Sequence, residues 1–257
     1  MTIAKTSMAC AFSVLAAASA AQAQTVIEQA AEHRFQLDFV VNAAVLQKML
    51  PQGWEPAVAT QGPAKDCNLR MIFIDRMDIV GADGKAAGKG AQRLVYLAVP
   101  VKQTAGGATG QMIIAGLTDD AADVPGAFGN YQRATTAKMT RSAEANAGAV
   151  QAREDWEFAA ANGERMEMHI AYERAPTPAK GGGEVKFYDP KDPSKYQIFR
   201  TEQGIDILRN ATTNPPNRVK EFSYKASGGR LASLFDGSEK VVSWDSYPWY
   251  NRTVLAP

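Results

Sequence analysis

Cysteine and histidine are scarce in this sequence. Its 257 residues contain two cysteines, Cys10 and Cys67, and two histidines, His33 and His169. Cys10 lies in an N-terminal stretch that is typical of a removable leader, so one cysteine remains after its removal. One cysteine forms no internal disulfide and supplies no thiolate cluster. The two histidines are far apart in sequence, and we therefore expect no metal site and no other cofactor.

An excess of charge of either sign is also missing. The chain has 28 basic and 27 acidic residues, a formal net charge of +1. Nucleic acids and anionic membranes are bound through concentrated positive charge, so neither is an expected partner. Beyond the N-terminal stretch no apolar run approaches 18 residues, and nothing there is predicted to span a bilayer. With 46% apolar residues the chain is predicted to be globular.

Residues 1–23 have the features of a secretory signal peptide. Lys5 is their one charge, an apolar stretch follows, and the segment ends in Ala21-Gln22-Ala23, a small-x-small cleavage pattern. Removal of these residues leaves 234, with 27 basic and 27 acidic side chains. The sequence therefore predicts a periplasmic or secreted protein, with residues 24–257 as one domain.

Period-two alternation of apolar and polar residues is the main structural signal. It is clear over residues 35–41, where Phe35, Leu37 and Phe39 alternate with polar neighbours. Trp156 and Phe158, then Asn162-Gly163, predict a hairpin with a type I′ turn. Further strands are expected at 69–74, 94–101, 112–117, 166–172, 184–188, 196–200, 218–224 and 240–244.

Two or three short helices complete the prediction. Asn42 is placed to cap one that ends before Pro51, and a second is expected at 230–235. No alternation of strands with helices and no repeat is visible. The pattern predicts a mostly β, antiparallel protein, built as a barrel or as bent, packed sheets.

Three stretches, taken in order, resemble the acetoacetate decarboxylase-like superfamily. They are residues 37–54 (LDFVVNAAVLQKMLPQGW), 93–101 (RLVYLAVPV) and 124–138 (VPGAFGNYQRATTAK). The resemblance implies a double-barrel-like, mostly antiparallel fold around an apolar cavity. It also implies a lysine that forms a Schiff base with a keto acid, and frequent assembly into homo-oligomers.

The catalytic positions of that family depart from the pattern here. The place of the reactive lysine holds Gln132, which has no nucleophilic amine, and Arg133 keeps the neighbouring cation. The strand around Tyr96 lacks the expected carboxylate. Lysine becomes a nucleophile when an apolar pocket and a nearby cation disfavour its ammonium form. Lys138 is the alternative candidate, and a solvated strand lysine is the competing interpretation.

Strand alternation places Tyr131 and Arg133 on one face, where a phenol and a guanidinium would bind a carboxylate. The candidate catalytic residues are therefore Lys138, Tyr131 and Arg133. The candidate substrate-binding residues are Arg133, Gln132, Phe128 and Trp249. An ion pair at the surface, or packing in the core, explains the same residues without a ligand.

Other reactive side chains carry weaker hypotheses. His33 is a candidate general base, whereas His169 is predicted to be exposed and Cys67 to be half-buried and structural. Asp119 and Asp120, with Asp123, lack the oxygen periodicity of a calcium loop and are interpreted as a turn.

Two functions remain open from the sequence. The first is an enzyme, with lyase, decarboxylase-like or hydrolase activity on a small keto or carboxylic acid. The second is a non-catalytic protein that binds a small ligand in the cavity.

Overall fold

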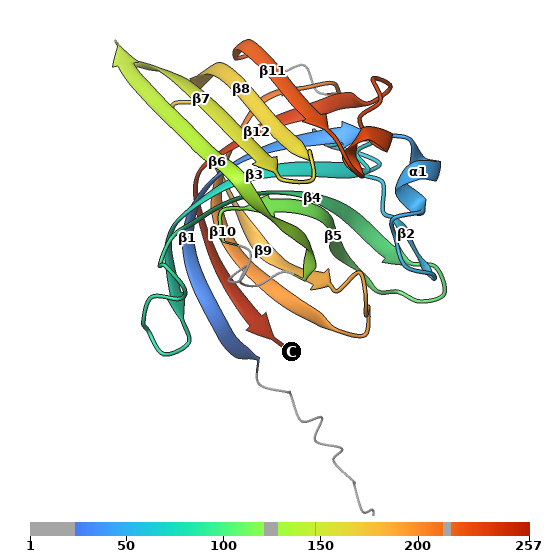
Figure 1. Cartoon of the computed structure of the whole chain (residues 1–257). Coiled ribbons are helices and arrows are strands. Elements are labelled where there is room, and N and C mark those ends of the chain that lie inside the picture. The colour runs from blue at the N-terminus through green and yellow to red at the C-terminus, as the bar shows by residue number, and fades with distance from the viewer. Residues whose placement is uncertain (1–23, 121–127, 147, 213–216) are drawn as a thin grey trace, which may run out of the picture.

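A computed structural model describes residues 24–120, 128–146, 148–212 and 217–257 (Figure 1). The predicted signal peptide, together with Asp123, lies outside these residues. The elements are β1 (Thr25–Val40), α1 (Ala43–Gln47), β2 (Trp54–Pro56), β3 (Leu69–Gly81), β4 (Gln92–Gln103), β5 (Thr109–Thr118), β6 (Gly129–Asn146), β7 (Ala149–Ala160), β8 (Arg165–Arg174), β9 (Ala179–Tyr188), β10 (Tyr196–Asn210), β11 (Val219–Ser227), the 3-10 helix η1 (Leu231–Ser233) and β12 (Lys240–Ala256). The prediction of a mostly β protein is confirmed.

Seven strands close into a ring, which we call the barrel. Its order is β5-β9-β10-β12-β1-β3-β4, and β4 pairs back with β5. All of these pairings are antiparallel except that of β5 with β9, a single parallel bridge between Gln111 and Phe187. The first and last strands, β1 and β12, are therefore neighbours in the wall, and Figure 1 shows them side by side.

A second sheet leaves the barrel through β6. The start of β6 pairs in parallel with β5, from Gly129 to Arg133. The rest of β6 continues into the antiparallel order β6-β7-β8-β11, which we call the second sheet (Figure 1). The pairing is therefore mostly antiparallel, and the two parallel exceptions are the pairings of β5 with β6 and with β9.

The main apolar core lies between the barrel wall and the second sheet. Phe35 and Leu37 of β1 pack there with Phe73 of β3 and with Trp156 and Phe158 of β7. In β8 the residues at every second position are buried, as the sequence predicted. A smaller apolar cluster, which contains Ile72, Tyr96 and Phe199, lies inside the barrel.

The short helices form where the sequence predicted them. The Asn42 side-chain oxygen accepts hydrogen bonds from the backbone N–H groups of Ala44, at 3.0 Å, and Val45, at 3.4 Å, and so caps α1. The second predicted helix is the single 3-10 turn η1. Among the described residues no helix is long and apolar enough to cross a membrane.

The hairpin between β7 and β8 forms, but its turn is not type I′. Gly163 has a φ of +86°, whereas Asn162 does not adopt a positive φ. The Gly163 N–H donates to the carbonyl of Ala160, and the Asn162 side chain accepts from the N–H of Glu164. The loop therefore needs only one left-handed residue, which glycine supplies, and asparagine stabilises it from the side.

Candidate functional site

Strand β1 sends alternate side chains to opposite sides of the barrel wall. Phe35 and Leu37 enter the main core, and Arg34 and Gln36, at the alternate positions, point into the barrel. Both sides are closed to solvent, so the polar residues are buried as well: Arg34 is 4% exposed. A buried charge is tolerated only where other groups pair with it, and the barrel interior supplies them.

The barrel encloses a cavity of about 160 Å³. This is the liquid volume of roughly five water molecules, well below the size of a site for a drug-sized ligand. All seven barrel strands contribute to its wall, which is mostly polar or aromatic, whereas the sequence predicted an apolar cavity. The lining residues are Arg34, Gln36, Arg70, Ile72, Tyr96, Gln111, Val185, Phe187, Thr201, Gln203, Tyr247 and Tyr250.

Arg34 is fixed at one end of this cavity. Its Nε donates to Glu32 Oε2 at 2.5 Å, and its guanidinium carbon lies 3.6 Å from the centroid of the Tyr250 ring. Burial alone would lower the pKa of Arg34, but the Glu32 carboxylate outweighs it, so the pKa is raised. The guanidinium is a permanent cation that faces the cavity and an aromatic ring.

More cations than carboxylates gather behind Arg34. Arg252 Nη2 lies 2.9 Å from Glu28 Oε1 and 3.0 Å from Glu32 Oε1. Arg76 pairs with the same two carboxylates, its Nε lying 3.4 Å from Glu32 Oε1. In this cluster three guanidinium groups therefore share two carboxylates. Burial, with the like charge of Arg252, lowers the pKa of Arg76 to about 10, against the opposing effect of the Glu32 and Glu28 carboxylates.

Tyr96 offers a free donor to the cavity. Its hydroxyl is buried and has no hydrogen-bond partner among the described residues, and the same is true of the Gln111 side-chain oxygen in the same wall. Burial raises the pKa of Tyr96, so its hydroxyl stays protonated and can donate. An unpaired buried polar group is costly, and a ligand that accepts from it would remove that cost.

Arg70 marks the other end of the cavity. Its Nε lies 3.5 Å from Asp38 Oδ1, and the Gln36 amide donates to the same oxygen at 2.9 Å. Asp245, close to Asp38, accepts from Ser243 Oγ at 2.7 Å. Burial, with the Asp38 carboxylate, raises the pKa of Asp245 to about 8, so Asp245 holds a proton at neutral pH.

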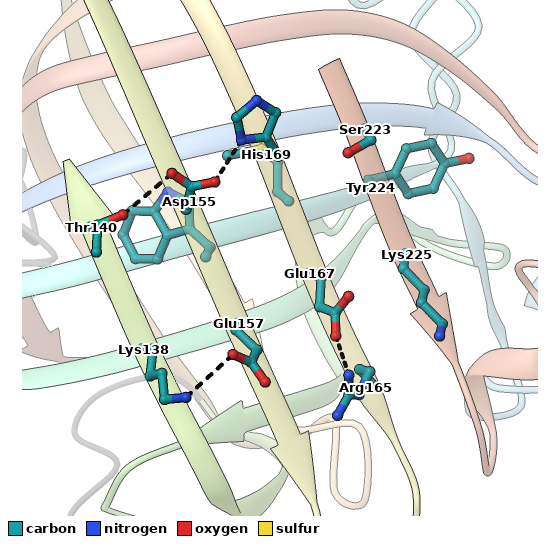
Figure 2. A pocket seen from close by; sticks show the side chains of 12 residues that line it. Lys138, Thr140, Asp155, Glu157, Arg165, Glu167, His169, Ser223, Tyr224 and Lys225 are labelled. Atoms are coloured by element: carbon teal, nitrogen blue, oxygen red, sulfur yellow. Dashed lines mark hydrogen bonds and ion pairs between the residues drawn. The ribbon is translucent and has the colours of Figure 1, made fainter. Parts of the chain in front are cut away.

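Lys138 lies on the outer face of the second sheet, which is open to solvent (Figure 2). Its side chain is 74% exposed, and its ammonium is 3.6 Å from Glu157 Oε2. Beside it on the same face, Arg165 pairs with Glu167 and His169 with Asp155 (Figure 2). These groups line an open groove of about 580 Å³ whose opposite charges neutralise one another. Lys138 thus lacks the surroundings that would make its amine a nucleophile.

Arg133 and Gln132 also point away from the barrel cavity. Arg133 is exposed. The Gln132 amide donates to Glu164 Oε2 at 2.7 Å, and Glu164 Oε1 accepts from the backbone of Arg230 at 3.2 Å. Gln132 therefore joins β6 to the segment before η1.

The three aromatic candidates lie in different places. The half-buried Tyr131 ring meets Tyr96 edge-on, with centroids 6.4 Å apart, and packs against the apolar cluster inside the barrel. Phe128, just before β6, is half-buried. Trp249 is 38% exposed and covers Gly204 on β10. Of the predicted residues, Tyr131 alone lies behind a side chain of the cavity wall.

The weaker candidates are placed as follows. His33 is buried, and its Nε2 lies 2.9 Å from Glu154 Oε1. Cys67 is buried, and burial together with the Asp38 carboxylate raises its pKa to about 12, which leaves the thiol unreactive. Among the described residues no group of three histidine, cysteine or acidic side chains could hold a metal ion.

The sequence contained one overlooked signal for the cavity. Arg34, Gln36 and Asp38 alternate with apolar residues, and such a pattern ordinarily indicates a solvent-facing side. Tyr96, Arg70 and Tyr250 likewise occur inside strands that are otherwise apolar. Bulky polar residues on the second face of long strands are also what a closed, polar interior requires.

No family model and no curated protein matches the chain by sequence. Solved structures do resemble it. The chain aligns with an acetoacetate decarboxylase-like enzyme from Sphingomonas wittichii RW1 at a TM-score of 0.53 and 9% identity, over 90% of this chain and 91% of that one. It aligns with the enduracididine biosynthesis enzyme MppR, in complex with pyruvate, at 0.53 and 10%, over 92% and 91%. The chain has the acetoacetate decarboxylase-like fold.

A third structure supports the same assignment. The acetoacetate decarboxylase from Legionella pneumophila subsp. pneumophila str. Philadelphia 1 aligns at a TM-score of 0.50 and 13% identity, over 91% of this chain and 86% of that one. At such low identity the likeness describes the acetoacetate decarboxylase-like fold and not its chemistry. The fold implied by the sequence resemblance is confirmed.

Proposed function

We propose that this protein binds a small carboxylic acid in the barrel cavity, non-covalently, with Arg34 holding the carboxylate. The main support is the charge of the interior, where three guanidinium groups share two carboxylates next to the cavity. One bound monoanion balances that excess. Arginine suits the role because its planar donors match the two carboxylate oxygens.

The volume of the cavity and its unpaired hydroxyl group restrict the class of ligand that can bind. A volume of about 160 Å³ suits a short acid rather than a fatty acid. The unpaired Tyr96 hydroxyl fits an acceptor such as a keto or hydroxy oxygen beside the carboxylate. MppR, which shares the fold, is described in complex with pyruvate, a ligand of this class.

Calorimetric titration with pyruvate, acetoacetate and acetate tests the proposal, with neutral acetamide as the ligand control. We expect the acids to bind and acetamide not to bind. Arg34→Gln should weaken binding roughly tenfold or more, about 1.4 kcal/mol. Arg133→Gln removes the same charge from an exposed site and should leave the affinity unchanged.

Arg34 also pairs with Glu32, so Arg34→Gln can disturb folding. Arg34→Lys keeps the charge and loses the planar fork, and it should fold with the wild-type circular dichroism spectrum but bind the acids more weakly. Equal affinity of both folded Arg34 variants and the wild type for every acid would refute the proposal.

A catalytic use of the same cavity is the second candidate. The observation that favours it is the protonated, unpartnered Tyr96 hydroxyl, which can donate to a developing oxyanion. No lysine is among the described residues that line the cavity, so we expect a keto acid to form no Schiff base. Borohydride trapping with pyruvate should leave the mass of the protein, and of the peptide with Lys138, unchanged.

Export is a separate proposal, and it rests on the leader pattern of residues 1–23. We infer cleavage after Ala23 and a periplasmic or secreted protein that begins at Gln24. Intact mass spectrometry of protein from an exporting host tests this: a mature chain that still contains Lys5 would contradict it.

A further inference from the structure

A second pocket lies outside the barrel, where the second sheet meets the barrel wall. Its volume is about 230 Å³, and it is separate from the cavity described above. Side chains of β1, β6, β7, β8 and β12 line it. They are His33, Arg141, Ser142, Ala143, Ala152, Tyr172, Arg174 and Pro248.

A buried carboxylate holds one wall of this pocket in place. Glu154 is fully buried, and its Oε1 lies 2.9 Å from His33 Nε2 and accepts from the Tyr172 hydroxyl at 2.7 Å. Its Oε2 accepts from Trp156 Nε1 at 3.0 Å. The His33 ring also stacks on Trp156, with planes 5° apart. These contacts fix the orientation of the imidazole and the phenol that face the pocket.

The charges of the pocket do not cancel. Burial alone would raise the pKa of Glu154, but His33 and the hydrogen bonds outweigh it, so the pKa is lowered and Glu154 is an anion. Arg141 and Arg174, in the same pocket, form no ion pair with any described residue. Two guanidinium groups that pair with no carboxylate of the described residues therefore face one half-enclosed space.

We propose that this pocket binds a phosphate group as its dianion, held by Arg141 and Arg174, with the His33 imidazole at its base. Two arginines match the two charges and the several oxygens of phosphate. The pocket has room for that group, which is the size of a few waters. Neither this site nor its ligand depends on what the barrel cavity binds.

Calorimetry with inorganic phosphate, at an ionic strength held constant with sodium chloride, tests the site. We expect one phosphate to bind to the wild type and its affinity to fall at least tenfold in Arg141→Gln and in Arg174→Gln. Lys225→Gln removes an equal charge from the opposite face of the second sheet and should bind as the wild type does.

Each outcome of these titrations either supports or overturns the proposed phosphate site. Wild-type affinity in the Arg141→Gln, Arg174→Gln double variant would overturn the proposal, as would a phosphate effect that sodium chloride alone reproduces. Both arginines are outside the core, so these variants should keep the wild-type melting temperature without phosphate. Loss of binding together with loss of fold would overturn it too, because it would assign the arginines a structural role.

The phosphate group can belong to a free anion or to a lipid headgroup. Co-sedimentation with vesicles of phosphatidate in phosphatidylcholine, against phosphatidylcholine alone, separates the two sources. Retention that requires Arg141 and Arg174 supports the site with a lipid ligand. Binding of inorganic phosphate without retention supports the site with a soluble ligand.

Discussion

At the scale of single residues, the barrel interior is defined by polar groups that lack full partners. The Tyr96 hydroxyl is the clearest of them, since it is buried beside Arg34 and forms no hydrogen bond within the part of the chain that the structure describes. Such a group contributes little to the stability of the empty protein. We expect it to contribute to ligand affinity, because a ligand can accept its hydrogen bond.

Replacement of Tyr96 by phenylalanine separates these two roles. We expect Tyr96→Phe to leave the free energy of unfolding within about 1 kcal/mol of wild type or to raise it, because an unpaired hydroxyl is removed. The affinity for pyruvate should fall roughly fivefold, about 1 kcal/mol. Urea denaturation and calorimetry measure the two quantities. A large loss of stability with unchanged affinity would show a structural hydroxyl instead.

Asp245 predicts how stability depends on pH. Its pKa of about 8 in the folded protein lies above the ordinary value of 3.8, because of burial and the Asp38 carboxylate. Between pH 4 and pH 8, roughly, the folded state keeps a proton that the unfolded state has lost, so this group makes stability fall as pH rises. The slope approaches about 1.4 kcal/mol per pH unit.

Asp245→Asn removes this titration. The variant should therefore gain stability over the wild type as the pH rises from 5 to 8, and little beyond. Chemical denaturation at several pH values gives the difference. Ser243 can still donate to the asparagine oxygen, so the hydrogen bond is retained. Parallel pH profiles for the two proteins would contradict the proton assigned to Asp245.

At the scale of elements, the close approach of β5 and β6 requires a glycine at position 116. A Cβ on Gly116 would lie 2.6 Å from the Tyr131 ring and 3.1 Å from the Val95 carbonyl oxygen. We expect Gly116→Ala to lower the free energy of unfolding by roughly 1–3 kcal/mol through overpacking. Gly107→Ala, where nothing lies within 4 Å, is the matched control and should be nearly neutral. Equal effects in urea denaturation would show that β6 can move aside.

The sequence predicted elements better than it predicted the site. Local rules predicted the cap of α1 by Asn42, the alternating burial of β8 and the hairpin that follows Phe158. All three are present in the structure. The inward face of β1 depends instead on strands far away in sequence, because only ring closure buries Arg34 and Gln36. Local pattern therefore finds the strand, but it cannot tell a solvent-facing side from a closed polar interior.

The same limit explains the placement of Lys138 and Arg133. Both lie on β6, as the resemblance suggested, but β6 changes from the barrel to the second sheet along its length. Tyr131, near its start, packs inward on Tyr96, whereas Lys138, further on, faces solvent. Alternation alone cannot show where along a strand one environment gives way to another.

At the scale of the whole molecule, the barrel has one weak junction. A single bridge joins β5 to β9, whereas the ladders of β1 with β12 and with β3 extend along nearly the whole strand. We expect native-state hydrogen exchange to show β9 amides opening at a lower free energy than β1 amides. Identical opening energies, equal to that of global unfolding, would show that the ring opens only as a unit.

The pairing of β1 with β12 also governs when the binding site can exist. The wall next to Arg34 is completed by Tyr247 and Tyr250, which are synthesised more than two hundred residues later. A growing chain therefore exposes its arginines and carboxylates to water until translation is almost finished, and no truncated product that lacks β12 can shelter a ligand.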